Sequence, residues 1–137
     1  MLERLADPWA RKELGRLLDE LLTRGRRLER GAWTPTWSGL TVVGTLTTTG
    51  RWARLERLVA VHVEAQGATS SASTVGTTYV NNLPFTAAAS AGALATDFSI
   101  NTGLLNGQVV IATTRLYTPT WAASGNLFGL DAWYETG

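Results

Sequence analysis

The side chains in this sequence that suit acid–base or metal chemistry are one histidine and the few carboxylates that follow it. His62 is the only histidine, so a metal site with two imidazoles would require several chains around an axis. The carboxylates of Glu64, Asp97, Asp131 and Glu135 form no recognisable pair, although two of them from adjacent chains would suit glycoside hydrolysis. We expect His62 to be a structural residue with a satisfied hydrogen bond.

Other sequence signatures of catalysis are missing. The chain has no cysteine, which excludes disulfides and thiolate metal ligands. It has no Gly-x-Ser-x-Gly motif, so a Ser-His-Asp arrangement would depend on long-range coincidence. We therefore predict that the protein is not an enzyme and carries neither a cofactor nor a metal.

The aromatic residues are more informative than the titratable ones. Six tryptophans, three tyrosines and three phenylalanines are enough for a core and a surplus. The string Tyr117-Thr-Pro-Thr-Trp121 is predicted to lie in a loop between the last strands, where aromatic rings can stack on sugars or fill a partner's pocket. Tyr117 and Trp121 are thus the predicted surface-recognition residues.

Charge is concentrated at the start of the chain. Residues 1–30 hold fourteen charged side chains and residues 66–137 hold four, while the 137 residues together carry a formal net charge of +1. Four arginines at positions 24 to 30 resemble a phosphate-binding patch, but a helix dipole favours cations in its last turns and acidic residues lie among them. We predict no nucleic-acid partner, and a charge-poor remainder that packs against copies of itself or meets the outside world.

No membrane-spanning or secretion signal is visible in the sequence. No run of eighteen apolar residues occurs, and Met1-Leu2-Glu3-Arg4 opens a charged amphipathic segment. We expect a soluble protein made in a cytoplasm, without membrane insertion.

A single helix is predicted from Pro8 to about Arg30. Asp7 and Pro8 form a favourable start, and Gly31 stands where a helix often ends. Leucines recur at heptad-like spacing on one broad stripe, and these are the predicted oligomerisation residues: Leu14, Leu17, Leu18, Leu21 and Leu28. Such a stripe packs either on the β domain of its own chain or on the same helix of other chains.

Three apolar residues precede the predicted helix or lie just inside its start. Leu2, Leu5 and Trp9 are unusual in a solvated terminus. They are predicted to attach a partner or to pack on the neighbouring helix.

The clearest two-residue periodicity runs from Gly50 to Glu64. Val59, Val61, Val63 and Ala65 fall on one face of an extended segment, which suits a core. The preceding run to Leu55 also resembles a strand, so a hairpin with its turn at Glu56-Arg57 is predicted, although the turn lacks an Asn-Gly or Asp-Gly signature.

In the rest of the chain, turn-forming residues occur at the spacing that is typical of an all-β domain. Short runs rich in Val, Thr, Leu, Trp and Tyr are separated by Gly, Asn, Pro and Ser, and residues 67–76 are expected to form a loop. The candidate strands are residues 33–37, 40–47, 51–55, 58–66, 77–83, 96–101, 108–114 and 125–134. We predict a mostly β protein, with a helical segment at 1–31 and a β-sandwich or jelly-roll-like head at 32–137.

Three strings carry a resemblance to a known family. They are Ala-Trp-Thr-Pro-Thr at 32–36, Thr-Gly-Arg-Trp-Ala-Arg-Leu-Glu-Arg-Leu-Val at 49–59 and Asn-Leu-Pro-Phe-Thr at 82–86. Their order resembles the C-terminal β domain of bacteriophage fibre and appendage proteins, and the resemblance covers roughly residues 32–137. Trp52 stands where that pattern more often has Tyr, and Glu56 where it more often has Gly.

The resemblance implies a homotrimeric virion component with a helical, coiled-coil-like stem and β heads on a tail or capsid. Its N-terminal segment would join other virion proteins, and its heads would face outward, where they contact a host glycan or protein. A capsid decoration or head fibre is the alternative within the family, and a carbohydrate-binding β module is the alternative outside it. The resemblance also favours self-association as the fate of the leucine stripe.

Overall fold

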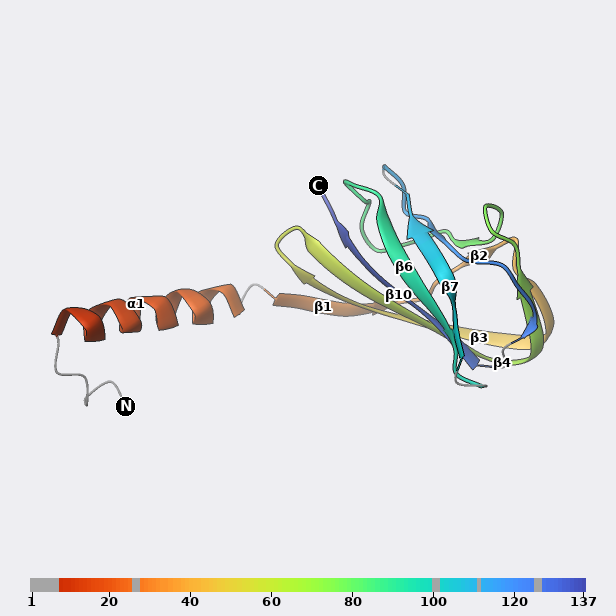
Figure 1. Ribbon diagram of the computed structural model, residues 1–137, viewed down its shortest axis with the longest axis horizontal. Coiled ribbons are helices and arrows are strands. Elements are labelled where there is room, and N and C mark those ends of the chain that lie inside the picture. Colours follow the sequence, from red (N-terminus) through yellow and green to blue (C-terminus); the bar gives the residue numbers. More distant parts are fainter. Residues whose placement is uncertain (1–7, 26–27, 100–101, 111, 125–126) are drawn as a thin grey trace.

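The computed structural model describes residues 8–25, 28–99, 102–110, 112–124 and 127–137, with side chains at 21–25, 102–106 and 123–124 left undescribed. These described residues form one helix and ten strands (Figure 1). Their bounds are α1 Pro8–Gly25, β1 Leu28–Trp33, β2 Trp37–Ser38, β3 Thr41–Leu55, β4 Leu58–Ser73, β5 Tyr79–Val80, β6 Ala91–Asp97, β7 Thr102–Val109, β8 Leu116–Tyr117, β9 Trp121–Ser124 and β10 Leu127–Glu135.

The helix is shorter than the sequence predicts. It begins at Pro8 as expected but ends at Gly25, and Leu28 to Trp33 form β1 instead of a last helical turn. The reason is the pairing of β1 with β3, in which Gly31 lies opposite Trp52 and receives its indole ring. Gly31 is therefore a strand residue, and the prediction that it ends the helix is wrong.

The strands form one antiparallel sheet that curls into a half-barrel (Figure 1). Their order is β1-β3-β4-β10-β6-β7-β8-β5-β2, and β9 pairs with β4 beside this path. Only residues 34–36 separate β1 from β2, the two edge strands, so the sheet edges are joined by a link that spans at most about 14 Å. A mostly β fold is confirmed, whereas the two-sheet sandwich or jelly roll is not.

The predicted hairpin is confirmed and longer than expected. β3 and β4 pair from Leu55 and Leu58 at the turn as far as Thr41 and Ala72. Glu56 has a φ of 54°, the left-handed value that type II′ turns place at their first central position. β4 runs on to Ser73, so most of the loop expected at residues 67–76 is a strand.

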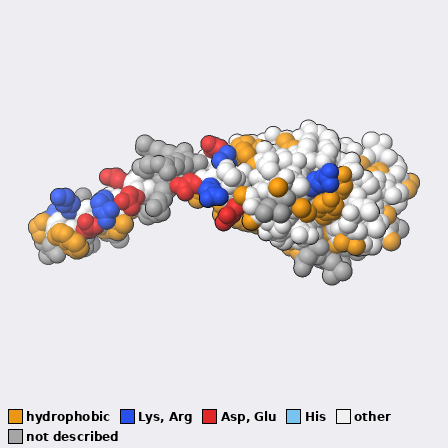
Figure 2. All heavy atoms as spheres, turned by 90° about the horizontal axis from the view of Figure 1, so that it is seen from above, with side chains coloured by type: hydrophobic (Ala, Val, Ile, Leu, Met, Phe, Trp, Pro, Cys, Tyr) orange, Lys and Arg blue, Asp and Glu red, His pale blue; other side chains and the backbone are white. Residues whose placement is uncertain are grey.

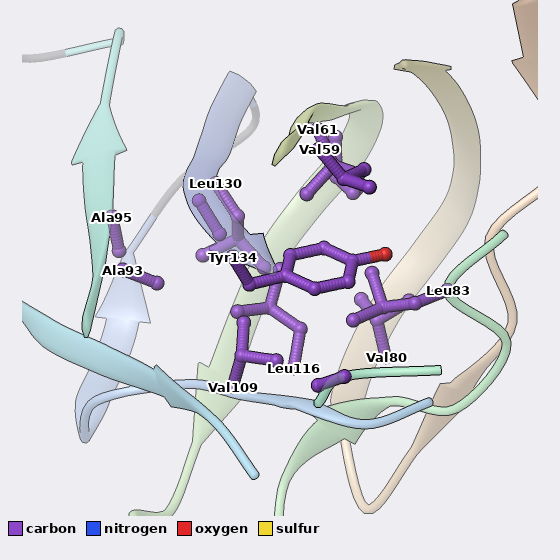
Figure 3. Close-up of a cluster of buried hydrophobic side chains, with 13 residues drawn as sticks. Val59, Val61, Val80, Leu83, Ala93, Ala95, Val109, Leu116, Leu130 and Tyr134 are labelled. Carbon is purple, nitrogen blue, oxygen red and sulfur yellow. The ribbon is translucent and has the colours of Figure 1, made fainter. Parts of the chain in front are cut away.

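The core lies on the concave face of the curled sheet. The apolar positions of β4 predicted to face inward are fully buried there: Val59, Val61, Val63 and Ala65. Figure 3 shows the ring of Tyr134 at the centre, surrounded by aliphatic side chains of several strands. The hydroxyl of Tyr134 donates a hydrogen bond to the backbone oxygen of Phe85 at 2.9 Å.

Stability is expected to fall in alkali because of Tyr134. Burial raises the pKa of Tyr134 to about 12, above the value of about 10 for an unfolded chain. The folded state therefore holds this proton more tightly, and the associated stability is full below pH 10 and is lost as the pH rises towards 12. Urea midpoints of the wild type and Tyr134→Phe between pH 8 and 11.5 should show a steeper alkaline loss for the wild type. Equal slopes would contradict the assignment, and Tyr117→Phe, at a half-buried surface position, is the control.

Two Gly-x-Trp strings, one in β1 and one in β3, pack against each other. Gly31 lies opposite Trp52 and Trp33 opposite Gly50, so each indole crosses to cover the glycine of the other strand. A Cβ atom on either glycine would come within 2.7 Å of the facing indole. Trp52 also contacts Phe85 edge-on, with ring centroids 4.9 Å apart.

Gly50→Ala is expected to lower the free energy of unfolding by about 1–3 kcal/mol, because the added methyl group must displace the packed indole of Trp33. Chemical denaturation measures the change. Gly92→Ala is the matched control, since a Cβ atom at this exposed strand position meets nothing within 4 Å and should leave stability unchanged or slightly raised. If Gly50→Ala is as stable as Gly92→Ala, the result contradicts the tight packing of the Trp33 indole on Gly50.

A five-residue pattern occurs twice and holds Phe128 from two sides. Trp33-Thr-Pro-Thr-Trp37 links the two sheet edges, and Tyr117-Thr-Pro-Thr-Trp121 links β8 to β9. The rings of Trp37 and Trp121 lie 5.7 and 5.1 Å from the ring of Phe128. The two strings therefore serve the same structural purpose: each contributes a tryptophan to a second core cluster, which is formed around Ala65, Trp121 and Phe128.

Candidate functional site

His62 lies between two carboxylates on the convex side of the sheet. Its Nδ1 is 2.7 Å from Oδ1 of Asp131, and its Nε2 is 3.6 Å from Oε2 of Glu64. An ionised carboxylate can only accept, so Nδ1–H donates to Asp131. The imidazole is about 30% exposed. The predicted hydrogen bond of His62 is confirmed, and its structural role stays a prediction.

The remaining carboxylates do not join this histidine. Asp97 is buried at the end of β6, where Oδ1 accepts hydrogen bonds from the backbone N–H of Ser99 at 2.9 Å and from its hydroxyl. Glu135 lies opposite Leu58 in the β10–β4 pair. Within the described part of the chain, no group of three or more potential ligands is placed to hold a metal ion.

The two predicted recognition residues have different positions. Trp121 is 5% exposed, its indole N–H donates to Oγ of Ser71 at 3.1 Å, and its ring packs on Phe128. The prediction of a surface role for Trp121 is therefore wrong, because its loop is fastened to β4 by β9. Tyr117 is half-buried and packs against Tyr79, with ring centroids 4.9 Å apart.

Tyr117 borders a neutral hollow on the surface. The hollow has a volume of about 700 Å³, and the described residues that line it, which include Ser90, Gln108, Tyr117 and Thr118, are all uncharged. Beside it, the Arg115 guanidinium lies over the Tyr79 ring at 4.8 Å and donates to the Tyr117 hydroxyl at 3.3 Å. This hydrogen bond raises the pKa of Arg115 above its usual value and fixes the orientation of the tyrosine.

The helix extends away from the β body, at the end where the β3–β4 hairpin turns (Figure 1). Trp9, Leu17 and Leu18 are 68%, 47% and 43% exposed, and Leu14 is half-buried. Leu21 lies in α1 among the undescribed side chains, and Leu2 and Leu5 lie outside the described residues. Leu28 does not belong to the helical stripe, because it is a β1 residue opposite Leu55.

The convex side of β1, β3, β4 and β10, here called the outer face, is a second exposed apolar surface. Strand register arranges it in three rows across the strands. From the hairpin end the rows are Leu28-Leu55-Leu58-Glu135, Arg30-Ala53-Ala60-Trp133 and Ala32-Arg51-His62-Asp131. Trp133 is 65% exposed, and a hollow of about 670 Å³ lies over the alanines beside it.

The sequence analysis assigned a role only to the inward-facing side chains of β4. Leu58 and Ala60 alternate with the buried valines, and each faces outward. The signal was available, since a strand that is apolar on both faces is typical of one covered on both faces.

Charge is unevenly distributed over the molecule. Figure 2 shows acidic and basic side chains along the helix and at its junction with the β body, whose visible surface is otherwise mostly uncharged or hydrophobic. On the outer face, cations occupy β1 and β3, at Arg30 and Arg51, while Asp131 and Glu135 lie on β10. No helix among the described residues has the length and apolarity required to cross a membrane.

Comparison with protein-family models, curated proteins and solved structures finds no match to this chain. The geometry of the helix, the outer face and the Tyr117 hollow is therefore the basis for any functional assignment.

Proposed function

We propose that the protein is a homotrimeric structural component of a bacteriophage virion, a fibre or appendage with a helical stem and outward-facing β bodies. The exposed leucine stripe of α1 carries this proposal. An isolated 18-residue helix is marginal in water, and this one extends away from the β body of its own chain. Its exposed ion pairs, Arg16 with Glu13 and Glu20 at 2.8 and 2.9 Å, add little stability. In this proposal the same helix of other copies covers the stripe, as the heptad-like spacing of its leucines favours.

The sequence strings that resemble phage fibre domains support the proposal through their positions. Asn82 accepts from the backbone N–H of Thr36 at 2.7 Å and donates to the backbone oxygen of Thr34 at 2.8 Å, while Phe85 packs on Trp52. The three strings thus meet in one contact cluster, which gives a structural reason for their joint occurrence. In this proposal Trp9 and the residues before it join the stem to other virion proteins.

Absolute mass in solution is the first test. Light scattering on the full chain should give three times the chain mass of 14.7 kDa. A monomeric mass would contradict the proposed helical stem. The protein would then be interpreted as a small binding module with a β fold.

Two alternative functions are compatible with the same structure. A capsid decoration or head fibre would use the same trimer to stiffen the shell instead of contacting a host. A carbohydrate-binding role is favoured by the neutral hollow beside Tyr117, because an aromatic ring with hydroxyl and amide groups suits a sugar. Titration with host cell-wall glycans separates them, since saturable binding that Tyr117→Ala abolishes and Tyr134→Phe retains would favour a host-binding surface.

A further inference from the structure

The outer face is exposed and largely apolar, and its acidic and basic residues lie on different strands. Trp133 is 65% exposed and Leu28, Leu55 and Leu58 are each more than 40% exposed, although all four residues belong to paired strands of the sheet. A contiguous exposed apolar surface with charges at its margins is typical of a protein–protein interface.

We propose that the outer face packs on the outer faces of two further copies of this chain, around a three-fold axis that continues the stem. The inference rests on the proposed trimer and adds to it the part of the β body that holds the copies together. β1 begins three residues after α1 ends, so any bundle of helices brings the β1 strands of all copies close to one axis.

The rows of the outer face determine which residues meet. Figure 1 shows β1 and β3 running roughly along the helix direction, so each row lies across a shared axis. In a parallel trimer, residues of one row in one copy therefore face the same row in the next copy. The β1/β3 half of each face meets the β4/β10 half of its neighbour, a heterologous contact that closes into a ring.

In two of the three rows, an arginine of one copy meets a complementary group of the next copy. Next to the stem, Leu28, Leu55 and Leu58 form an apolar layer. In the middle row, Arg30 of one copy faces Trp133 of the next, a pairing that suits a cation–π contact. In the third row, Arg51 faces Asp131 across the interface.

Within one chain, the acidic and basic residues proposed to meet at the interface differ in whether they already have a charged partner. Asp131 already accepts from His62, whereas neither Arg30 nor Arg51 forms an ion pair with another described residue. Association with a second copy gives Arg51 the carboxylate of Asp131 and gives Arg30 the indole ring of Trp133. A nucleic acid or an acidic peptide would instead meet Glu64, Asp131 and Glu135 on the same face, which disfavours a strongly anionic partner.

Because the chain has no cysteine, disulfide cross-linking tests the interface directly. Arg51 and Asp131 are separated by β4, so their Cα atoms lie about 10 Å apart within one chain, beyond the roughly 7 Å that a disulfide tolerates. A disulfide in the full-length Arg51→Cys/Asp131→Cys variant therefore joins two copies. Mild oxidation at low micromolar concentration should give covalent trimers on a non-reducing gel.

A matched pair on the other half of the sheet is the control. Gln108 and Ser38 lie on the same convex side, three strands apart, and Gln108→Cys/Ser38→Cys should remain mostly unlinked. If the Arg51/Asp131 variant is not trimeric by light scattering under reducing conditions, Ala32→Cys/Leu94→Cys is the second test. Leu94 on β6 lies opposite Asp131 and extends the third row by one strand, so this variant keeps the charges of the row intact.

The outcomes of the cross-linking experiment distinguish failure of the proposed interface from failure of the proposed trimer. Covalent trimers well above the control support the interface. A wild-type trimer whose test pairs link no better than the control overturns the interface and leaves the stem. Covalent products that stop at dimers overturn the three-fold arrangement, and a monomeric wild type overturns the trimer together with its interface.

Discussion

Phe128→Ala is expected to lower the free energy of unfolding by about 3–5 kcal/mol, the range for a large aromatic residue removed from a rigid core. The side chain is 1% exposed and lies between the rings of Trp37 and Trp121. Both tryptophans are fixed through their indole N–H groups, Trp37 to Oγ1 of Thr48 at 3.0 Å and Trp121 to Oγ of Ser71 at 3.1 Å. The cavity cannot collapse without loss of these hydrogen bonds, which places the cost in the upper part of the range.

Urea denaturation at one fixed protein concentration measures the effect, because stability depends on concentration in any oligomer. Phe98→Ala is the control: Phe98 is 38% exposed and covers Gly129, so its removal should cost roughly 1 kcal/mol or less. Equal losses from the two substitutions would show that the pair of tryptophans does not hold Phe128 as the structure indicates.

The sequence predicted the local structure wherever one periodicity dominated. The alternation from Val59 to Ala65 identified the central strand and its buried face, and Pro8 identified the helix start. The hairpin turn was also predictable, although Glu56 adopts a positive φ that glycine would accept more readily. In each case the signal lies within a few residues of the element it specifies.

Long-range pairing determined what local patterns could not predict. Leu28-Glu29-Arg30 suits a helix as well as a strand, and the contact of Gly31 with Trp52, twenty-one positions away, selects the strand. Trp121 resembles a loop residue until β9 pairs with β4 and the indole reaches Ser71. The choice between two packed sheets and one curled sheet likewise depends on the order of the strands, which spacing does not reveal.

The candidate surfaces were predicted in part for the same reason. The helical leucines were recognisable from spacing alone, and Leu17 and Leu18 are exposed as a stem would require. The outer face was not recognised, because its rows join residues as distant as Arg30 and Trp133 that only strand register brings together. Sequence periodicity shows which side of a strand a residue occupies, but not which residues of other strands lie beside it.

Replacing Leu14 and Leu18 by aspartate should convert the proposed trimer into monomers. A carboxylate buried in a bundle of helices is strongly unfavourable, and two per chain place six like charges around one axis. The β body should keep its fold, because every described member of its core clusters lies after α1 in the chain. Sedimentation velocity of the full-length variant measures the mass, and near-ultraviolet circular dichroism of the buried tryptophans reports the β body.

Lys12→Asp is the matched control for the stem prediction. Lys12 lies two residues before Leu14, about 160° around the helix from it, so the new carboxylate points away from the leucine stripe. This variant should remain trimeric with at most a modest loss of stability. A trimer that survives Leu14→Asp/Leu18→Asp would remove the stem as the source of association. The outer face would then have to hold the copies alone, and a trimer lost equally in both variants would indicate a general effect of charge on the helix.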